Sequence, residues 1–183
     1  MASAQPQKVG RNRVAIIAEM SVMIALAAVL NTVKVLTLPE GGSVTLGAMV
    51  PLLLFALRRG TKAGVVAGMI FGVIDLYFEP FVYNPIQFLL DYPLAFGALG
   101  LAGNFRARPL LAVAAGIAGR FTCHFLSGLI FFASFAPAGE SPAVYSALYN
   151  GSYLLPEFVI SAVVILVLAN RGALKAGIHS MAS

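Results

Sequence analysis

Long apolar runs follow one another along almost the whole chain, with short polar or Gly/Pro-rich stretches between them. Charged residues make up only 10% of the 183 residues and hydrophobic residues make up 60%. A soluble domain carries about 25% charged residues, and a transmembrane helix needs about 20 mostly apolar ones. The pattern therefore predicts an all-α, polytopic membrane protein.

Six runs are long enough to name as expected transmembrane helices. They lie at about 14–36, 44–57, 62–77, 85–102, 109–135 and 147–168. The run 44–57 is too short to cross a hydrocarbon core of ~30 Å alone, so the preceding loop has to extend it or the protein has to line a thinned region. We expect one membrane domain over 11–172, a disordered end at 1–10 and a C-terminal tail at 173–183.

The basic residues fall on alternate loops of this six-helix arrangement. Ten of the twelve would lie on one side: Lys8, Arg11, Arg13, Arg58, Arg59, Lys62, Arg106, Arg108, Arg171 and Lys175. The remaining loops carry Glu40, Glu79 and Glu140. The positive-inside rule then predicts that both the N- and the C-terminus are cytoplasmic. The net charge of +5 thus indicates orientation in the lipid bilayer, and we expect no nucleic-acid partner.

Small residues recur at helical spacing in two of the runs. Gly60, Gly64, Gly68 and Gly72 form a stripe along the third run. Such a stripe lets a second helix approach closely, and packing inside the bundle is the favoured interpretation. The first run carries a shorter pair, Ser21 and Ala25, in its cytoplasmic half. Internal packing and an interface with another membrane protein remain equally open for this pair.

The polar side chains inside the runs gather at one depth. At ~1.5 Å of rise per residue, seven of them fall in the outer half of the expected bundle. They are Asp75, Asp91, Arg120, His124, Tyr145, Asn150 and Glu157. Only Glu19 lies near the cytoplasmic end. Buried structural pairs and a proton relay are alternatives, but a relay needs polar groups in the inner half as well, so a pocket open to the outside is favoured.

The residues around this level limit the ligand. Acids outnumber bases, and nine aromatic side chains accompany them: Phe81, Tyr83, Tyr92, Phe125, Phe131, Phe132, Tyr145, Tyr149 and Tyr153. Carboxylates beside aromatic faces suit a flat, cationic or amino-bearing heterocycle. The expected function is therefore binding of such a ligand.

No motif of catalysis or of energy conversion is present in the sequence. It has no phosphate-binding G-x-x-x-x-G-K-[ST] loop, no H-E-x-x-H and no G-x-S-x-G. Cys123 is the single cysteine, and we expect neither a metal nor another cofactor. A secondary carrier and an intramembrane enzyme that uses Asp91 and His124 stay open as alternatives to a binding protein.

Short segments spread over most of the chain resemble one known family. They are EGGSVT (40–45), LRRGTKAG (57–64), LLDY (89–92), RFTCH (120–124), FASFAP (132–137) and YSALYN (145–150). In this order they resemble the thiamine-specific substrate-binding (S) component of the energy-coupling-factor (ECF) vitamin transporters. The resemblance implies a six-helix membrane subunit that captures thiamine outside the cell. Its implied partners are a transmembrane coupling protein and two cytoplasmic ATPase subunits; an S component for another cationic or heterocyclic vitamin precursor is the nearest alternative.

The resemblance also assigns expected roles to individual residues. The expected ligand-binding residues are Asp91, Tyr92, His124, Phe132, Tyr145, Asn150, Phe81, Arg120 and Glu157. Arg120 and Glu157 are expected to support the pocket beneath the ligand. Ser21 and Ala25 resemble the pair that contacts the coupling protein.

The loop between the first two runs departs from the family pattern. Relatives can place a Trp there over the ligand, whereas this chain has no Trp and carries Gly41 and Gly42 instead. We expect the segment 38–47 to close over the ligand, with its glycines acting as hinges.

Overall fold

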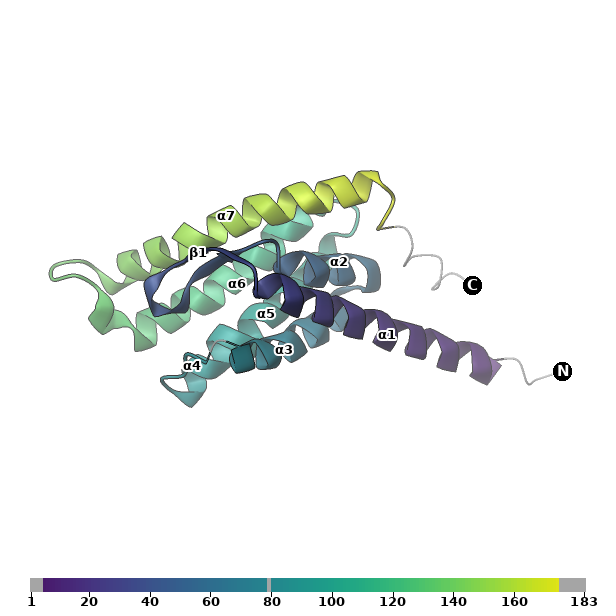
Figure 1. The fold of residues 1–183 in the computed structure, drawn as a ribbon, viewed down its shortest axis with the longest axis horizontal. Coiled ribbons are helices and arrows are strands. Elements are labelled where there is room, and N and C mark those ends of the chain that lie inside the picture. The colour runs from purple at the N-terminus through teal and green to yellow at the C-terminus, as the bar shows by residue number, and fades with distance from the viewer. Residues whose placement is uncertain (1–4, 79, 175–183) are drawn as a thin grey trace.

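A computed structural model describes residues 5–78 and 80–174 of the chain, which form a bundle of helices with one small hairpin (Figure 1). The long helices are α1 (Gln5–Asn31), α2 (Met49–Arg59), α3 (Thr61–Phe78), α6 (Pro109–Phe131) and α7 (Pro142–Asn170). A continuous helical segment between α3 and α6 consists of α4 (Pro85–Leu89), η2 (Leu90–Leu94), α5 (Ala95–Ala98) and η3 (Leu99–Phe105). The prediction of an all-α membrane protein is confirmed, with the hairpin as an addition to it.

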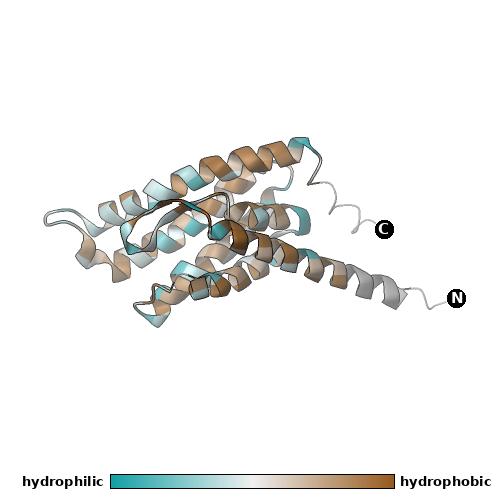
Figure 2. Ribbon diagram, in the orientation of Figure 1, coloured by the Kyte–Doolittle hydropathy of each residue, from teal (hydrophilic) through white to brown (hydrophobic). Residues whose placement is uncertain are grey.

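Five helical segments are long and apolar enough to cross a membrane. They are Arg13–Asn31, Thr61–Phe78, Pro85–Phe105, Pro109–Phe131 and Pro142–Asn170. The sixth helix, α2, has 11 residues, and its side chains from Met49 to Leu57 are buried between the others. Figure 2 shows hydrophobic residues along α1 and the C-terminal half of α7, and more hydrophilic residues in the half of the bundle that carries the hairpin. The chain is thus a multi-pass membrane protein of the cell membrane.

The first two predicted helices have different boundaries in the structure. α1 ends at Asn31 instead of continuing to Leu36, and α2 begins at Met49 instead of Val44. The residues between them form the antiparallel strands β1 (Lys34–Thr37) and β2 (Ser43–Thr45). Val33, just before β1, and Val35 and Thr37 within it alternate along the chain, and such β-branched residues favour an extended chain over a helix. Hydropathy alone therefore overextended both helices.

The two ends of the chain also differ from the predicted domain division. α1 begins at Gln5, so residues 5–10, which were expected to be disordered, are helical. Of the expected tail 173–183, only residues 173 and 174 are described, as a turn after α7. Residues 1–4 and 175–183 lie outside the described part of the chain.

The glycine stripe of α3 is a seam between two helical segments. A Cβ atom at Gly64, Gly68 or Gly72 would meet the backbone of the segment 92–103, at Gly100, Phe96 and Tyr92 respectively. The two backbones touch because no side chain separates them. The prediction that this stripe packs inside the bundle is confirmed for these three glycines, whereas Gly60 ends α2 and has open space where its Cβ would lie.

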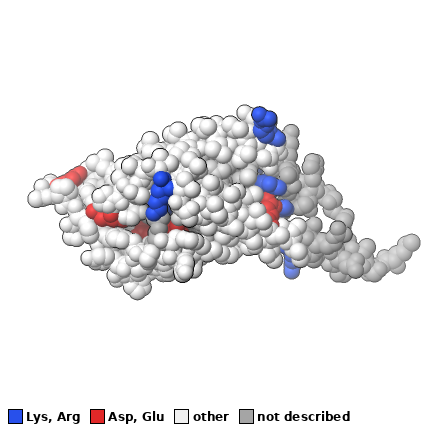
Figure 3. All heavy atoms as spheres, in the orientation of Figure 1, with Lys and Arg blue, Asp and Glu red and all other residues white. Residues whose placement is uncertain are grey.

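An ion-pair cluster ties α1 to the end of α2. Glu19 accepts a hydrogen bond from Arg59 Nε at 2.6 Å and lies 2.9 Å from Arg58 Nε. Both arginines are in the last turn of α2, where cations also favour the negative end of the helix dipole. Figure 3 shows that basic surface is concentrated near this end of the molecule and acidic surface toward the opposite end, with one basic patch between them.

Candidate functional site

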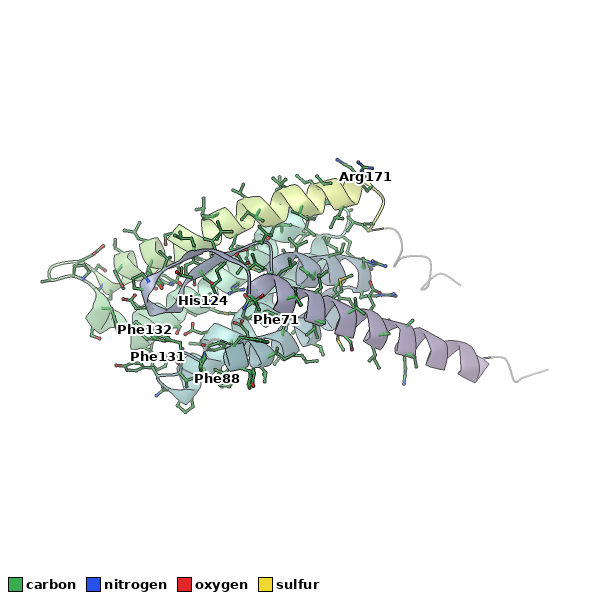
Figure 4. All side chains as sticks on the ribbon, viewed as in Figure 1. Phe71, Phe88, His124, Phe131, Phe132 and Arg171 are labelled. Carbon is green, nitrogen blue, oxygen red and sulfur yellow. The ribbon has the colours of Figure 1, made fainter. Side chains whose placement is uncertain are left out.

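A cavity of about 140 Å³ lies in the half of the bundle away from the chain termini. Figure 4 shows His124 and Phe132 in this half, whereas Arg171 marks the other end. The cavity is lined by Asn31, Glu40, Gly41, Gly42, Ser43, Asp75, Phe81, Gln87, Asp91, Tyr92, Phe96, Arg120, His124, Ser127, Gly128, Phe132, Tyr145, Ser146, Tyr149, Asn150 and Tyr153. Its walls thus come from the hairpin and from α1, α3, α6, α7 and the 85–105 segment.

Asp91 is the most extensively bonded acid of the cavity. Its Oδ1 lies 3.0 Å from His124 Nδ1, and its Oδ2 accepts hydrogen bonds from Ser127 Oγ and Gln87 Nε2, each at 2.7 Å. Asp91 lies in η2, a turn wider than an α-helix, together with Pro93, which has no N–H to continue the regular pattern. Turns of this kind are frequent at functional sites because they redirect side chains.

His124 is held between an acid and a base, and its neighbours define its tautomer. Arg120 Nε donates to His124 Nε2 at 3.2 Å, so Nε2 has to be the accepting nitrogen. Nδ1 therefore carries the hydrogen and donates to Asp91. The Arg120 guanidinium also lies 3.8 Å from the centre of the Phe96 ring, which is a cation–π contact. Arg120 is thus held by His124 and Phe96 while it lines the cavity.

Helix α7 contributes a ladder of tyrosines. Tyr145, Tyr149 and Tyr153 are spaced four residues apart, which places them on one face of the helix. Neighbouring rings lie 6.1 Å and 5.9 Å apart between centroids. Asn150 is only 5% exposed, and its Oδ1 accepts a hydrogen bond from the Tyr153 hydroxyl at 2.8 Å. The ladder thus gives the cavity both aromatic faces and directional polar groups.

The upper part of this ladder holds the tip of the hairpin. The Tyr145 hydroxyl donates to Glu40 Oε2 at 2.9 Å, and the backbone N–H of Gly42 donates to the Tyr149 hydroxyl at 2.9 Å. Tyr149 in turn donates to the carbonyl of Pro39. Gly41 has φ 89°, a conformation that glycine adopts without strain. The tip therefore lies over the cavity, as expected for a covering segment.

An aromatic wall closes another side. The Phe81 and Phe132 rings stack with 5.8 Å between centroids and 29° between planes. Tyr83 meets Phe132 edge-on, and the Tyr92 hydroxyl accepts a hydrogen bond from the Phe81 backbone N–H at 2.8 Å. These contacts fix Phe132 as a flat surface on which a planar ligand can stack.

Most of the predicted ligand-binding residues line the cavity. Those that do are Phe81, Asp91, Tyr92, Arg120, His124, Phe132, Tyr145 and Asn150. Glu157 lies outside this lining and lines a smaller neighbouring cavity that shares Asn31, Ser43 and Arg120 with it. Its Oε1 instead accepts hydrogen bonds from the Thr45 backbone N–H at 2.5 Å and from Thr45 Oγ1 at 2.6 Å. Glu157 anchors the C-terminal strand of the hairpin.

Sequence reasoning missed several polar residues of the cavity. Gln87 and Asn31 were not singled out. Gln87 lies four residues before Asp91, and this helical spacing could have predicted their contact. Asn31 donates to Asp75 Oδ1 at 2.6 Å, across a distance in sequence that no local pattern encodes. Ser127, which donates to Asp91 Oδ2, was given no role either.

The expected partner-interface residues lie on a free face of α1. Ser21 and Ala25 are both exposed, and the apolar side chains of Val14 and Val29 are exposed near them at 67% and 63%. Ser21 donates its hydroxyl to the carbonyl of Ile17 within the helix. This arrangement leaves a shallow surface of small side chains facing outward.

Within residues 5–78 and 80–174, no group of three or more His, Cys, Asp or Glu residues is placed to hold a metal ion.

The bundle and its cavity together define a class of protein. A helical membrane protein with a polar, aromatic-lined cavity near one end is a solute-binding membrane protein. The family described as "Thiamine transporter protein (Thia_YuaJ)" matches residues 17–175, and the chain belongs to this family.

Curated relatives and a solved structure agree with this membership. The chain is 35% identical to "Thiamine transporter ThiT" of Bacillus subtilis over 169 residues, which cover 82% of this chain and 88% of the relative. It is 33% identical to the protein of the same name from Lacticaseibacillus paracasei over 140 residues, or 66% of this chain and 70% of that one. A solved structure of ThiT from Listeria monocytogenes has the same fold, with a TM-score of 0.77 at 24% identity, over 92% of this chain and 97% of that chain.

Proposed function

We propose that this chain is the thiamine-binding membrane subunit of an ECF-type transporter. The cavity formed around Asp91 carries the proposal, because it combines a fixed carboxylate with aromatic faces. Thiamine joins an aminopyrimidine to a positively charged thiazolium, so it presents both an amino-bearing ring and a cationic ring. Membership of the thiamine transporter family and the names of the two curated relatives support the same ligand.

The residues of the cavity offer complementary contacts to such a ligand. Asp91 offsets a positive charge or accepts a hydrogen bond from an amino group, and its own donors hold it in place. Phe132 and the α7 tyrosines provide surfaces for stacking and cation–π contact. Asn150 and Tyr145 add directional hydrogen bonds, which penalise analogues that lack the matching groups.

We further propose that uptake depends on partner proteins. The sequence contains no ATP-binding loop, so the energy would come from two cytoplasmic ATPases acting through a membrane coupling protein. The exposed small residues Ser21 and Ala25 on α1 are suited to close contact with a helix of that protein. The chain itself would act as a binding subunit rather than as an enzyme.

The proposed orientation places the cavity toward the outside. The basic residues flank the opposite end of the bundle, which the positive-inside rule assigns to the cytoplasm. The hairpin tip, held by Tyr145 and Tyr149, would then close the external mouth. Thiamine would enter when this tip swings away from α7.

Titration of the purified chain with thiamine tests the proposal. We expect calorimetry to report saturable binding at micromolar ligand or below. Tyrosine fluorescence provides a second signal, since the chain has no Trp and four tyrosines line the cavity. Riboflavin, a flat but uncharged heterocycle, is the matched control ligand and is expected to give no binding. Absence of thiamine binding at micromolar concentrations would contradict the assignment.

A further inference from the structure

The tip of the hairpin carries a carboxylate where it covers the cavity. Glu40 lines the cavity and accepts the hydrogen bond of the Tyr145 hydroxyl at 2.9 Å. Its backbone has φ 64°, a left-handed conformation that is unfavourable for residues with a side chain. The contacts of the neighbouring Pro39 and Gly42 with Tyr149 hold this conformation. The Glu40 carboxylate is therefore kept over the cavity by the closed hairpin.

Glu40 differs from the other charged groups of the cavity in its position. Asp91 and Arg120 lie on the helices beneath it and are engaged by His124, and Asp75 accepts the Asn31 amide. Glu40 instead belongs to the hairpin tip that covers the cavity. Lys34, on the same hairpin, does not line the cavity. The charge presented at the covering side of the cavity is thus negative.

This charge has a consequence for ligands that differ in their own charge. A phosphate group is strongly hydrated and is taken into a protein only where cations or several N–H donors replace its water. The guanidinium that lines the cavity, Arg120, lies one helical turn further along α6 from the hairpin end than His124, donates to that ring through Nε and packs on the Phe96 ring. We take the phosphate-bearing end of the ligand to face the mouth, where it would lie beside Glu40. Two like charges in that setting repel each other.

We propose that Glu40 is a specificity-determining residue that disfavours anionic forms of the ligand, phosphate esters above all. This proposal rests on the proposed function, because the ligand that enters is taken to be thiamine. The carboxylate lowers affinity for thiamine monophosphate relative to thiamine, and it does so only while the hairpin is closed. Glu40 thus discriminates between thiamine and its phosphate esters, whereas the residues around Asp91 bind the two rings that these ligands have in common.

The test compares two ligands in three proteins. Kd values of thiamine and thiamine monophosphate are measured by calorimetry for the wild-type chain, for Glu40→Gln and for the control Glu140→Gln. The Glu40→Gln amide still accepts the Tyr145 hydrogen bond, so the hairpin stays closed. Glu140 is a carboxylate in the loop before α7 that does not line the cavity. We expect the Kd of thiamine monophosphate divided by the Kd of thiamine to fall about tenfold in Glu40→Gln. The same ratio is expected to stay unchanged in Glu140→Gln.

Ionic strength gives a second measurement that needs no variant. Salt screens repulsion between partly exposed charges, so the Kd ratio of the wild-type chain is expected to fall as salt rises, and that of Glu40→Gln is expected to change little. An unchanged ratio in Glu40→Gln, or a wild-type ratio independent of salt, overturns the role of Glu40. A wild-type chain that binds neither ligand would instead refute the proposed function, which is a distinct outcome.

Discussion

At the scale of single residues, the cavity is organised before a ligand arrives. Asp91 accepts hydrogen bonds from Gln87, Ser127 and His124, and these fix its position. His124 is fixed in turn by Arg120. Preformed donors and acceptors reduce the entropy that has to be lost when a ligand is ordered. Under the proposed function, this polar network would meet the ligand without having to rearrange.

Replacing Asp91 tests this organisation directly. Asp91→Asn removes the negative charge and turns an amide N–H₂ toward the Gln87 or Ser127 donor. We expect thiamine binding to weaken by at least about 1.5–3 kcal/mol, the range for a lost hydrogen bond to a charged group, measured by calorimetry. Asp91→Glu keeps the charge and is expected to retain most of the affinity. Equal affinity in wild type and Asp91→Asn would remove Asp91 from the ligand contacts.

Much of the site could be predicted from individual residues, and the reasons are physical. Charged and amide groups are costly inside a membrane, so Asp91, Arg120, His124 and Asn150 were conspicuous in apolar runs. Glu157 was equally conspicuous but is committed to Thr45 of the hairpin. Depth along a helix could be counted, whereas the direction in which a side chain points around the bundle could not. Residues outside the apolar runs gave no comparable signal.

At the scale of elements, the hairpin and the glycine seam differ in how far the sequence predicts them and in how they are held. The hairpin was hidden from sequence reasoning because β1 is apolar but exposed, so hydropathy joined it to the preceding helix. The seam was predictable because glycines at every fourth residue fall on one face of α3. The hairpin is attached through Glu40, Gly42 and Thr45. The seam is a backbone-to-backbone contact along three turns.

Alanine substitutions in two helices test the seam. Gly68→Ala places a methyl group on the carbonyl of Phe96, which cannot move aside. We expect this overpacking to lower stability by about 1–3 kcal/mol, seen as a lower thermal unfolding midpoint in detergent. Gly151→Ala is the matched control, since α7 leaves open space there. It is expected to be neutral or slightly stabilising through helix propensity. A Gly68→Ala variant as stable as Gly151→Ala would contradict the close approach.

At the scale of the whole molecule, the two ends of the bundle carry different features. The cavity and the hairpin occupy one end, and the Glu19 cluster with Arg58 and Arg59 occupies the other. Helix α1 connects them and packs against α2 and α3 on one side while its other side stays exposed. A partner docked on that exposed side can act on the chain without entering the binding site.

A bulky substitution on the exposed face of α1 is expected to affect transport without affecting ligand binding. Ala25→Trp fills the shallow small-residue surface beside Ser21, so we expect ATP-dependent thiamine uptake in the assembled transporter to fall at least about tenfold because the helices can no longer approach closely. Thiamine affinity of the isolated chain is expected to stay unchanged. Leu26→Trp is the control, because Leu26 is also exposed, at 46%, but already large. Uptake that survives Ala25→Trp would refute the interface.

The attachment of the hairpin to α7 also bears on how long a bound ligand would stay in the cavity. The bonds of Glu40 with Tyr145, of Gly42 with Tyr149 and of Thr45 with Glu157 have to break before the cavity opens. Escape of a captured molecule is then a first-order event, paced by local opening of this one segment. Under the proposed function, the lifetime of the loaded state would follow from the rate of this opening, and slow opening would leave the proposed coupling protein more time to engage before the ligand dissociates.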